Sequence, residues 1–399
     1  MSRRVVITGL GSVSPLGNGA RILYDRWSAG ETGIEDGIAP CSDFDPSEFL
    51  SSKEVRRNDR FVQLALAAAQ EALAQAEWDD EPPYDTERIG CVVGTGIGGI
   101  GSLESQHDVL RDKGPDQVSP LAVPLMMANA ATAALVMRHG LRGPTQTTVS
   151  ACAAGTDGIG AALRMIRSGD ADAVVTGGAE STLTPLAQSA FAAMDATSES
   201  GIMRPFDARR DGFVMGEGAG ILVLEDADAA EARGATILGE VLGYGASADA
   251  YHIPAPDPAG RGATKAIERA LADAGVGPED IDYVNAHGTS TPLNDSAETE
   301  ALKAGLGEER AKAIPTSSTK SAIGHLLGAA GGVEAVATVI ALQEGKAPPT
   351  LGYGDPDEGL DLDYVPDGPR DIANGGRLIA LSNAFGFGGH NGVLCLAAP

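Results

Sequence analysis

Six short apolar runs, rich in valine, isoleucine and leucine, recur along the chain and alternate with alanine-rich stretches. Runs of this length and composition are typical of β-strands. Because their apolar character is nearly continuous rather than alternating, we expect a sheet that is covered on both faces. The predicted strands span residues 4–9, 88–94, 171–178, 219–225, 281–286 and 377–384.

Two alanine-rich stretches between these runs have helical spacing. In residues 59–78 a small or aliphatic residue returns every fourth position from Leu64 to Ala76. Residues 261–275 have a similar stripe and end at Gly275, which suits the position after a helix. The alternation of strands and helices predicts an α/β protein.

Two segments of the chain resemble each other, 153–169 and 329–345. Each begins with Ala-Ala-Gly, carries an aliphatic helical stripe and ends in glycine. A match this short also arises by chance in a chain rich in alanine and glycine. A duplication would pair two strand–turn–helix units. Because no proline- or serine-rich linker separates them, we expect two intimately packed halves, residues 1–250 and 251–399.

Composition narrows the classes of partner. The sequence has 29 Lys and Arg against 55 Asp and Glu, a net charge of -26. This charge argues against nucleic acid and anionic membranes as partners. No apolar run approaches the roughly 20 residues of a membrane span, so we expect no membrane insertion. The four cysteines form no C-x-x-C pair, which indicates free thiols in a reducing, cytoplasmic location.

The segment VVGTGIGGIG (92–101) has the G-x-G-x-x-G spacing of dinucleotide-binding loops. That motif also needs a following helix, a second strand and an acidic residue about 20 residues on. The polar stretch that follows gives no such context. We therefore interpret the glycines as a tight turn or as a wall beside a ligand.

Cys152 lies in TTVSACAAG, where a strand-like run changes into a helix-like one. A cysteine in the first turn of a helix experiences the partial positive charge of unpaired N–H groups, which favours the reactive thiolate. Small neighbours would let a bulky substrate approach. The sequence of this turn fits a buried core cysteine equally well.

Two histidines in glycine-rich turns favour the reactive interpretation. His287 directly follows a predicted strand, and His325 precedes the helix that matches the one after Cys152. If the two helix starts face each other, thiol and imidazole come together. Asp295 and Glu298 follow His287, but their spacing fits no common metal site, and we expect no metal.

Five motifs together resemble the β-ketoacyl-[acyl-carrier-protein] synthases, above all the type II condensing enzymes of fatty acid synthesis. They are VSACAAG, PFDARRDGFVMGEGAG, VNAHGTSTPLND, SSTKSAIGHLLGAAGG and NAFGFGGHN, in the family's order and across nearly the whole chain. The resemblance implies a thiolase-like fold, in which two duplicated α/β halves form five layers, and a homodimer. It implies no cofactor, because the substrates are carried on the phosphopantetheine arm of acyl carrier protein.

The resemblance also implies a catalytic set. Cys152 would carry the acyl group as a thioester, and His287 and His325 would hold the thioester oxygen of the malonyl substrate. Phe387 would supply an oxyanion N–H and gate the acyl pocket. Lys320 and Glu334 would order the site. The remaining implied positions are Thr289 and Thr291 for the phosphopantetheine arm, and Ile97 and Phe191 for the acyl pocket.

An acidic carrier protein needs a local basic surface on this acidic chain. Lys53, Arg56, Arg57 and Arg60 cluster around the start of the helix predicted at 59–78. Cations at a helix start oppose its dipole, so local stability does not account for them. We expect Lys53, Arg56 and Arg57 to dock carrier protein, against the alternative of a solvated charged turn.

Three functions remain open at this point. The first is elongating condensation in fatty acid synthesis. The second is the same reaction in a polyketide pathway, with the same catalytic residues. The third is a non-catalytic partner that sets chain length, against which the intact set of Cys152, His287 and His325 argues.

Overall fold

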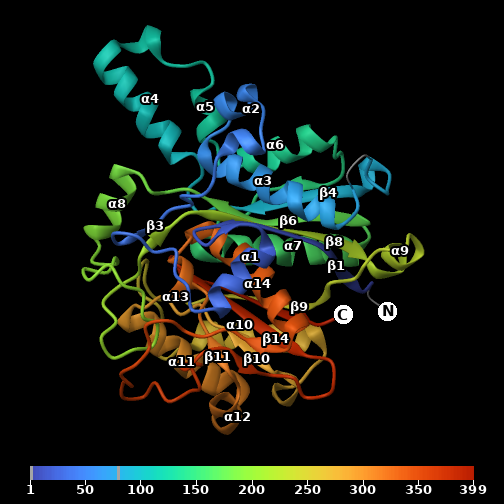
Figure 1. Cartoon of the computed structure of the whole chain (residues 1–399), viewed down its shortest axis with the longest axis vertical. Coiled ribbons are helices and arrows are strands. Elements are labelled where there is room, and N and C mark those ends of the chain that lie inside the picture. The colour runs from blue at the N-terminus through green and yellow to red at the C-terminus, as the bar shows by residue number, and fades with distance from the viewer. Residues whose placement is uncertain (1–2, 79–80) are drawn as a thin grey trace.

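Figure 1 shows five stacked layers in the computed structural model, which describes residues 3–78 and 81–399. Two sheets enclose a central helical layer, formed mainly by α7 (Ala154–Ser168) and α14 (Ala330–Glu344). Helices α3 (Arg60–Gln75) and α6 (Ala130–His139) cover the first sheet, and α10 (Arg261–Ala274) and α11 (Pro292–Leu306) lie outside the second. The expected thiolase-like α/β arrangement is confirmed.

The two sheets have the same strand order and the same pairing directions. The first runs β5 (Thr145–Gln146), β4 (Ile89–Gly94), β6 (Ala173–Glu180), β8 (Gly218–Asp226) and β1 (Val5–Ser14). The second runs β11 (Thr316–Ser317), β10 (Tyr283–Asn285), β14 (Ile379–Gly386), β15 (His390–Ala397) and β9 (Gly239–Ala248). In both, two parallel pairings are followed by two antiparallel ones.

The halves are therefore duplicated, as the repeat in the sequence predicted. Within residues 3–78 and 81–399, the two sheets join where β1 pairs with β9 over two residue pairs. The repeated segments form α7 and α14, which end at Gly169 and Gly345, both in the left-handed conformation that favours glycine. The division of the chain at residue 250 stays a prediction.

Glycines let the two central helices meet backbone to backbone. A Cβ atom at Gly155 would lie 2.7 Å from the backbone nitrogen of Gly332, and one at Gly331 would lie 2.5 Å from that of Thr156. Real Cβ atoms do not approach this closely, so no larger residue fits. This contact brings together the starts of α7 and α14, beside which the candidate residues Cys152 and His325 lie.

Every predicted strand and helix is present, and the strands β9 and β15 were missed. Glycines interrupt the pattern of β9 because helix α10 packs directly on it. A Cβ at Gly245 would lie 2.0 Å from the carbonyl oxygen of Ala266, and one at Gly243 would lie 2.6 Å from that of Ala270. Close packing on a neighbouring helix therefore erased the apolar alternation by which a strand is usually recognised.

The other elements are shorter or peripheral. The helices are α1 (Ala20–Ser28), α2 (Ser52–Arg57), α4 (Ile100–Lys113), α5 (Ala122–Met126), α8 (Pro185–Ala192), α9 (Ala227–Ala232), α12 (Glu308–Ala313) and α13 (Lys320–Ile323). The strands are β2 (Gly17–Asn18), β3 (Ile38–Ala39), β7 (Met215–Gly216), β12 (Lys346–Ala347) and β13 (Arg370–Asp371). Among the described residues, none of the helices has the length and apolar character needed to cross a membrane.

Candidate active site

Cys152 and His325 lie at equivalent places in the two halves, next to the starts of α7 and α14. Each helix is preceded by one 3₁₀ turn, η4 (Ala151–Ala153) or η6 (Leu327–Ala329). The first residue of each turn has a positive φ, 50° at Ala151 and 47° at Leu327. Such a conformation is strained for residues other than glycine and recurs at functional sites.

His325 directs a proton at the sulfur of Cys152. Its Nε2 lies 3.1 Å from the Cys152 Sγ, and its Nδ1 accepts the backbone N–H of Leu327 at 3.2 Å. An imidazole nitrogen that accepts a hydrogen bond carries no proton. In the neutral ring the proton is therefore on Nε2, and His325 is a donor toward the cavity rather than a base for the thiol.

His287 is held in the same tautomer by a buried lysine. Lys320 Nζ lies 3.2 Å from the His287 Nδ1 and also forms an ion pair with Glu334. Because an ammonium group only donates, the His287 Nδ1 accepts and its Nε2 carries the proton. The His287 and His325 rings lie edge to face with centroids 5.4 Å apart.

Burial keeps both imidazoles neutral and the thiol protonated. Burial, and then the positive charge of Lys320, lowers the pKa of both His287 and His325 well below its usual value. Burial raises the pKa of Cys152 to about 11, although the Lys320 charge and the Phe387 N–H act in the opposite direction. The expected stabilisation of a thiolate is therefore outweighed by the desolvation of the buried sulfur.

The same three side chains are close enough to be considered as a metal site. The ligand atoms of Cys152, His287 and His325 all lie within 4.8 Å of one another. A metal needs an unprotonated nitrogen, but Leu327 N–H and Lys320 occupy the unprotonated nitrogens. The two Nε2–H groups that remain suit an oxygen with developing negative charge better than a cation.

A cavity of about 380 Å³ joins the site to the surface, and Cys152, His287 and His325 line its inner end. Phe387 lines it in the loop between β14 and β15, and Phe191 lies beside it with ring centroids 6.4 Å apart.

Thr289 and Thr291 also line the cavity, and their hydroxyl groups lie 2.9 Å apart. Ile97 does not line this cavity in the single chain, where it is 41% exposed. The structure thus brings Thr289, Thr291, Phe191 and Phe387 to the candidate site, and leaves Ile97 outside it.

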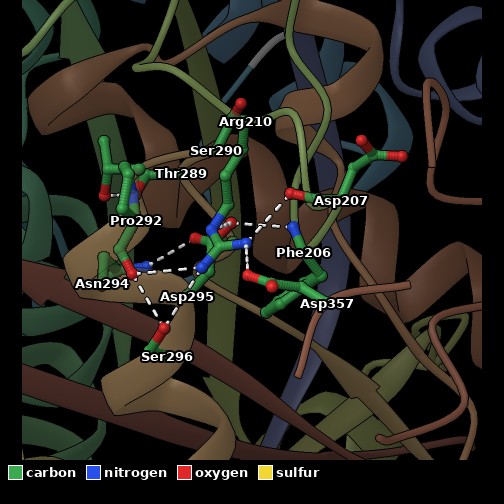
Figure 2. Close-up of polar contacts among 12 residues, drawn as sticks. Phe206, Asp207, Arg210, Thr289, Ser290, Pro292, Asn294, Asp295, Ser296 and Asp357 are labelled. Atoms are coloured by element: carbon green, nitrogen blue, oxygen red, sulfur yellow. Dashed lines mark hydrogen bonds and ion pairs between the residues drawn. The ribbon is translucent and has the colours of Figure 1, made fainter. Parts of the chain in front are cut away.

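Figure 2 shows the contacts that hold residues 289–296, the segment that carries these threonines. The Arg210 guanidinium donates to the Asp357 carboxylate at 2.6 Å and to the Ser296 hydroxyl at 3.2 Å. The Asp295 carboxylate accepts the Phe206 N–H at 2.8 Å. Buried ionic and backbone contacts therefore hold the segment against the loop before β7, with the threonine side chains left facing the cavity.

A buried carboxylate fills the glycine-rich loop that resembled a dinucleotide site. The Glu180 carboxylate accepts the backbone N–H groups of Gly96, Ile97 and Gly98, and also that of Gly328 in η6. Helix α4 does follow this loop, contrary to expectation. The N–H groups that would bind a phosphate are nevertheless taken by an internal anion, so the loop is a tight turn around Glu180 and not a dinucleotide site.

Two family descriptions match the chain. "Beta-ketoacyl synthase, N-terminal domain" covers residues 36–230, and "Beta-ketoacyl synthase, C-terminal domain" covers residues 238–354. The chain belongs to the β-ketoacyl synthase family. Among curated relatives, the 3-oxoacyl-[acyl-carrier-protein] synthase 2 of Synechocystis is 48% identical, over 98% of this chain and 97% of its own. That of Staphylococcus aureus strain COL is 44% identical, over 98% of each chain.

Solved structures of ketosynthases superpose on this β-ketoacyl synthase over its whole length. A β-ketoacyl synthase from Burkholderia phymatum has a TM-score of 0.91 at 32% identity, with 100% of each chain covered. A ketosynthase of a type II polyketide synthase, solved with its acyl-carrier protein, has a TM-score of 0.89 at 32% identity and the same coverage.

The basic residues expected to dock a partner lie in a short helix of this β-ketoacyl synthase. Lys53, Arg56 and Arg57 belong to α2, are exposed, and form no ion pair among residues 3–78 and 81–399. The two arginines lie in the last turn of α2, where the helix dipole favours cations. The dipole argument for a docking role is therefore wrong, and Arg60 instead binds the Glu217 carboxylate at 2.6 Å.

The structural roles of three carboxylates around the site were not recognised from the sequence. Glu180 binds the glycine-rich loop, Asp295 accepts the backbone N–H of Phe206, and Glu298 accepts the backbone N–H of His287 at 2.8 Å. Burial raises the pKa of Asp295 to about 6 and that of Glu298 to about 7. The available signal was an acidic residue at the end of an otherwise apolar strand, such as Glu180 in ADAVVTGGAE.

Proposed function

We propose that the protein is a 3-oxoacyl-[acyl-carrier-protein] synthase, which condenses an acyl group on Cys152 with malonyl-[acyl-carrier-protein] and releases CO2. The observation that carries this proposal is the convergence of one thiol and two neutral Nε2–H donors at the end of a single cavity. A thiol can hold an acyl group, and paired donors can hold an enolate oxygen without a metal or organic cofactor.

In the first half-reaction the Cys152 sulfur attacks the thioester of an acyl carrier protein. The bond from the acyl carbon to the carrier sulfur breaks, and the proton of Cys152 passes to the departing carrier thiolate. The tetrahedral oxyanion is held by the backbone N–H groups of Cys152 and Phe387. Because burial raises the pKa of Cys152 to about 11, the thiol must lose its proton as it attacks.

In the second half-reaction the malonyl thioester oxygen lies against His287 and His325. The bond to the carboxylate breaks, CO2 leaves, and the electron pair forms an enolate whose oxygen receives both Nε2–H bonds. The enolate carbon attacks the acyl carbon on Cys152, and the freed Cys152 sulfur takes up one proton. Each such donor is worth about 3 kcal/mol of barrier.

Lys320 and Glu334 keep the two donors in order. Lys320 fixes the His287 tautomer through Nδ1, and Glu334 balances the buried ammonium charge. Its donor role toward His287 leaves Lys320 no function as a base. Because both charges are buried, loss of either residue would leave the other as an unpaired buried ion, which is costly for stability.

The substrates would reach this site on the phosphopantetheine arm of acyl carrier protein, in the cytoplasm. Thr289 and Thr291 present hydroxyl groups along the cavity, where the amides of the arm can hydrogen-bond. Phe387 would gate the passage to the acyl pocket, in which Phe191 and Ile97 take part. Lys53, Arg56 and Arg57 would dock the acidic carrier protein.

We also propose a homodimer. Helices α4 and α5 project from the body in Figure 1, and several large apolar side chains on them are exposed, namely Leu103, Leu110, Val123 and Met126. The edge strand β5 of the first sheet also has both of its residues exposed. A second copy would cover this apolar surface and bring Ile97 into a closed acyl pocket.

Elongation of fatty acids is favoured over a polyketide pathway by sequence distance. The curated 3-oxoacyl-[acyl-carrier-protein] synthases are 44% to 48% identical, whereas the polyketide ketosynthase solved with its carrier protein is 32% identical. A non-catalytic chain-length partner is disfavoured because Cys152, His287 and His325 are all present and in contact.

The test is to incubate the protein with acyl-[acyl-carrier-protein] and measure the intact mass of the enzyme. One acyl adduct per chain is expected on the wild type and none on Cys152→Ala. Addition of malonyl-[acyl-carrier-protein] should then remove the adduct and produce 3-oxoacyl-[acyl-carrier-protein]. An equal adduct on Cys152→Ala would overturn the proposal.

A further inference from the structure

The turn that carries Cys152 is tied to the first turn of α7 by one carboxylate. The Asp157 carboxylate accepts the Ser150 hydroxyl through one oxygen and the Tyr244 hydroxyl through the other, both at 2.5 Å. Ser150 directly precedes the strained residue Ala151 and lies two positions before Cys152. Asp157 therefore connects the nucleophile turn to strand β9 of the second sheet.

Neighbouring residues leave space for this connection. A Cβ at Gly160 would lie 2.5 Å from the Tyr244 ring, and one at Gly392 would lie 2.9 Å from the Asp157 carboxylate. The Arg164 guanidinium, also on α7, lies over the Tyr244 ring, 4.9 Å from its centroid. The Tyr244 ring and the Asp157 carboxylate are thus closely packed between α7 and the second sheet.

The position of Ser150 decides where the Cys152 N–H points. The Ser150 carbonyl accepts the Ala153 N–H at 3.1 Å, which closes the turn around Cys152. Gly386 passes so close that a Cβ there would lie 2.9 Å from the Ser150 oxygen and 3.1 Å from the Cys152 nitrogen. A small shift of Ser150 would therefore change the distance between the two proposed oxyanion donors, Cys152 N–H and Phe387 N–H.

We propose that Asp157 is a positioning residue for the condensation, which holds the Cys152 turn through Ser150 and is itself held by Tyr244. This inference rests on the proposed function. It concerns the oxyanion site and not the two histidines, so the two parts of the reaction should respond differently. Acyl transfer to Cys152 needs the oxyanion N–H groups, whereas decarboxylation needs only His287 and His325.

The first experiment compares acylation rates in single-turnover measurements with acyl-[acyl-carrier-protein]. Asp157→Ala and Ser150→Ala should each slow acylation about tenfold or more, because small misplacements of reacting groups are costly. The double variant should be no slower than either single variant, since both remove the same connection. Tyr244→Phe should have a smaller effect in the same direction, and Asp157→Asn should recover part of the rate.

The matched control is Asp273→Asn. Asp273 accepts the backbone N–H of the same Tyr244 at 2.9 Å and pairs with Arg167, but it has no contact with the Cys152 turn. The Asp273→Asn variant should be acylated at the wild-type rate. Additive losses in the Asp157 and Ser150 variants, or an unchanged rate in both, would overturn the inference.

The second experiment measures release of CO2 from malonyl-[acyl-carrier-protein] in the Cys152→Ala background. Adding Asp157→Ala should leave this rate within about twofold, whereas general damage to the fold would lower it. Equal loss of decarboxylation and acylation would therefore contradict a positioning role.

Alkylation of Cys152 by iodoacetamide tests the proposed function and the role of Asp157 separately. A wild type that is alkylated but accepts no acyl group would overturn the proposed function. The alkylation rate of Asp157→Ala should still differ at least threefold from that of Asp273→Asn, because the turn has moved. Equal alkylation rates would overturn the role of Asp157 independently of the function.

Discussion

The starts of α7 and α14 have the same backbone and different chemistry. Each follows a 3₁₀ turn that begins with a positive φ, at Ala151 in one half and Leu327 in the other. Along the repeated segments, Cys152 in the first half corresponds to Gly328 in the second. Duplication thus supplied two strained helix starts. One holds the nucleophile, and the other holds a glycine against the loop at Gly96, whose nitrogen a Cβ at Gly328 would approach to 2.1 Å.

The surroundings of the two helices differ in the same way. Helix α14 is buried from Ala330 to Leu342 and lies in the centre of the molecule. Its Glu334 carries the charge partner of Lys320, whereas the corresponding position in α7 is Gly158. The second half therefore provides the buried ion pair of Lys320 and Glu334, and the first half provides the Cys152 thiol and the small residues around it.

The largest effect should come from removing the charge of Lys320. Lys320→Ala leaves the Glu334 carboxylate buried without its partner, which should cost about 3–5 kcal/mol of stability. The double variant Lys320→Met/Glu334→Met should recover most of the melting temperature but not the condensation rate. Recovery of both in the double variant would contradict the assigned role of Lys320 in holding His287.

The contact between the two helices can be broken at one glycine. Gly331→Ala would place a Cβ 2.5 Å from the Thr156 nitrogen and should lower stability by about 3 kcal/mol. The control is Gly101→Ala, where a Cβ would lie 3.7 Å from its nearest neighbour and the helix should tolerate it. Equal melting temperatures of the two variants would show that the helices do not need this close approach.

The buried histidines should make stability depend on pH. Burial and the Lys320 charge lower the pKa of His287, so the unfolded chain binds more protons than the folded one below pH about 6.5. Stability should therefore fall as the pH drops from 7 to 5, and less steeply in His287→Gln. The raised pKa values of Asp295 and Glu298 make stability rise as the pH drops. Because the wild type and His287→Gln both contain these two residues, their contribution cancels when the two pH dependences are compared. Parallel thermal-unfolding curves would contradict a buried neutral His287.

The smallest effect is expected at the surface of the first half. Replacing Lys53, Arg56 and Arg57 together by Glu should raise the KM for acyl carrier protein about tenfold, since exposed ion pairs contribute up to about 1 kcal/mol each. Lys265→Glu/Lys346→Glu makes the same kind of change elsewhere on the surface and should leave KM unaltered. An unchanged KM in the triple variant would rule out α2 as the docking site.

The fold was largely predictable because most of its strands are apolar runs and because the repeated segments 153–169 and 329–345 can be recognised from a short stretch of sequence. The pairing of Cys152 with His325 could also be anticipated, since the two helix starts match in sequence. The tautomers could not, because they depend on the Leu327 N–H and on Lys320, which reach the rings only in the folded chain. The raised pKa of Cys152 was missed for a similar reason, as burial is a property of the whole fold.

Buried carboxylates were the other class that the sequence did not reveal. Glu180 lies far from Gly96 and Gly328 along the chain, yet it accepts backbone N–H groups from both. Asp157 reads as an ordinary acid in the first turn of a helix, and its contact with Tyr244 depends on the register of β9. Long-range contacts of this kind need the packed structure to be seen.

The most direct test separates acylation from decarboxylation in His325→Ala. In the structure His325 donates to the Cys152 sulfur and does not act as its base. The variant should therefore acylate Cys152 within about threefold of the wild-type rate. With malonyl-[acyl-carrier-protein] it should release CO2 at least about 100-fold more slowly, as expected for loss of one oxyanion donor. Failure to acylate, or decarboxylation at the wild-type rate, would contradict the account.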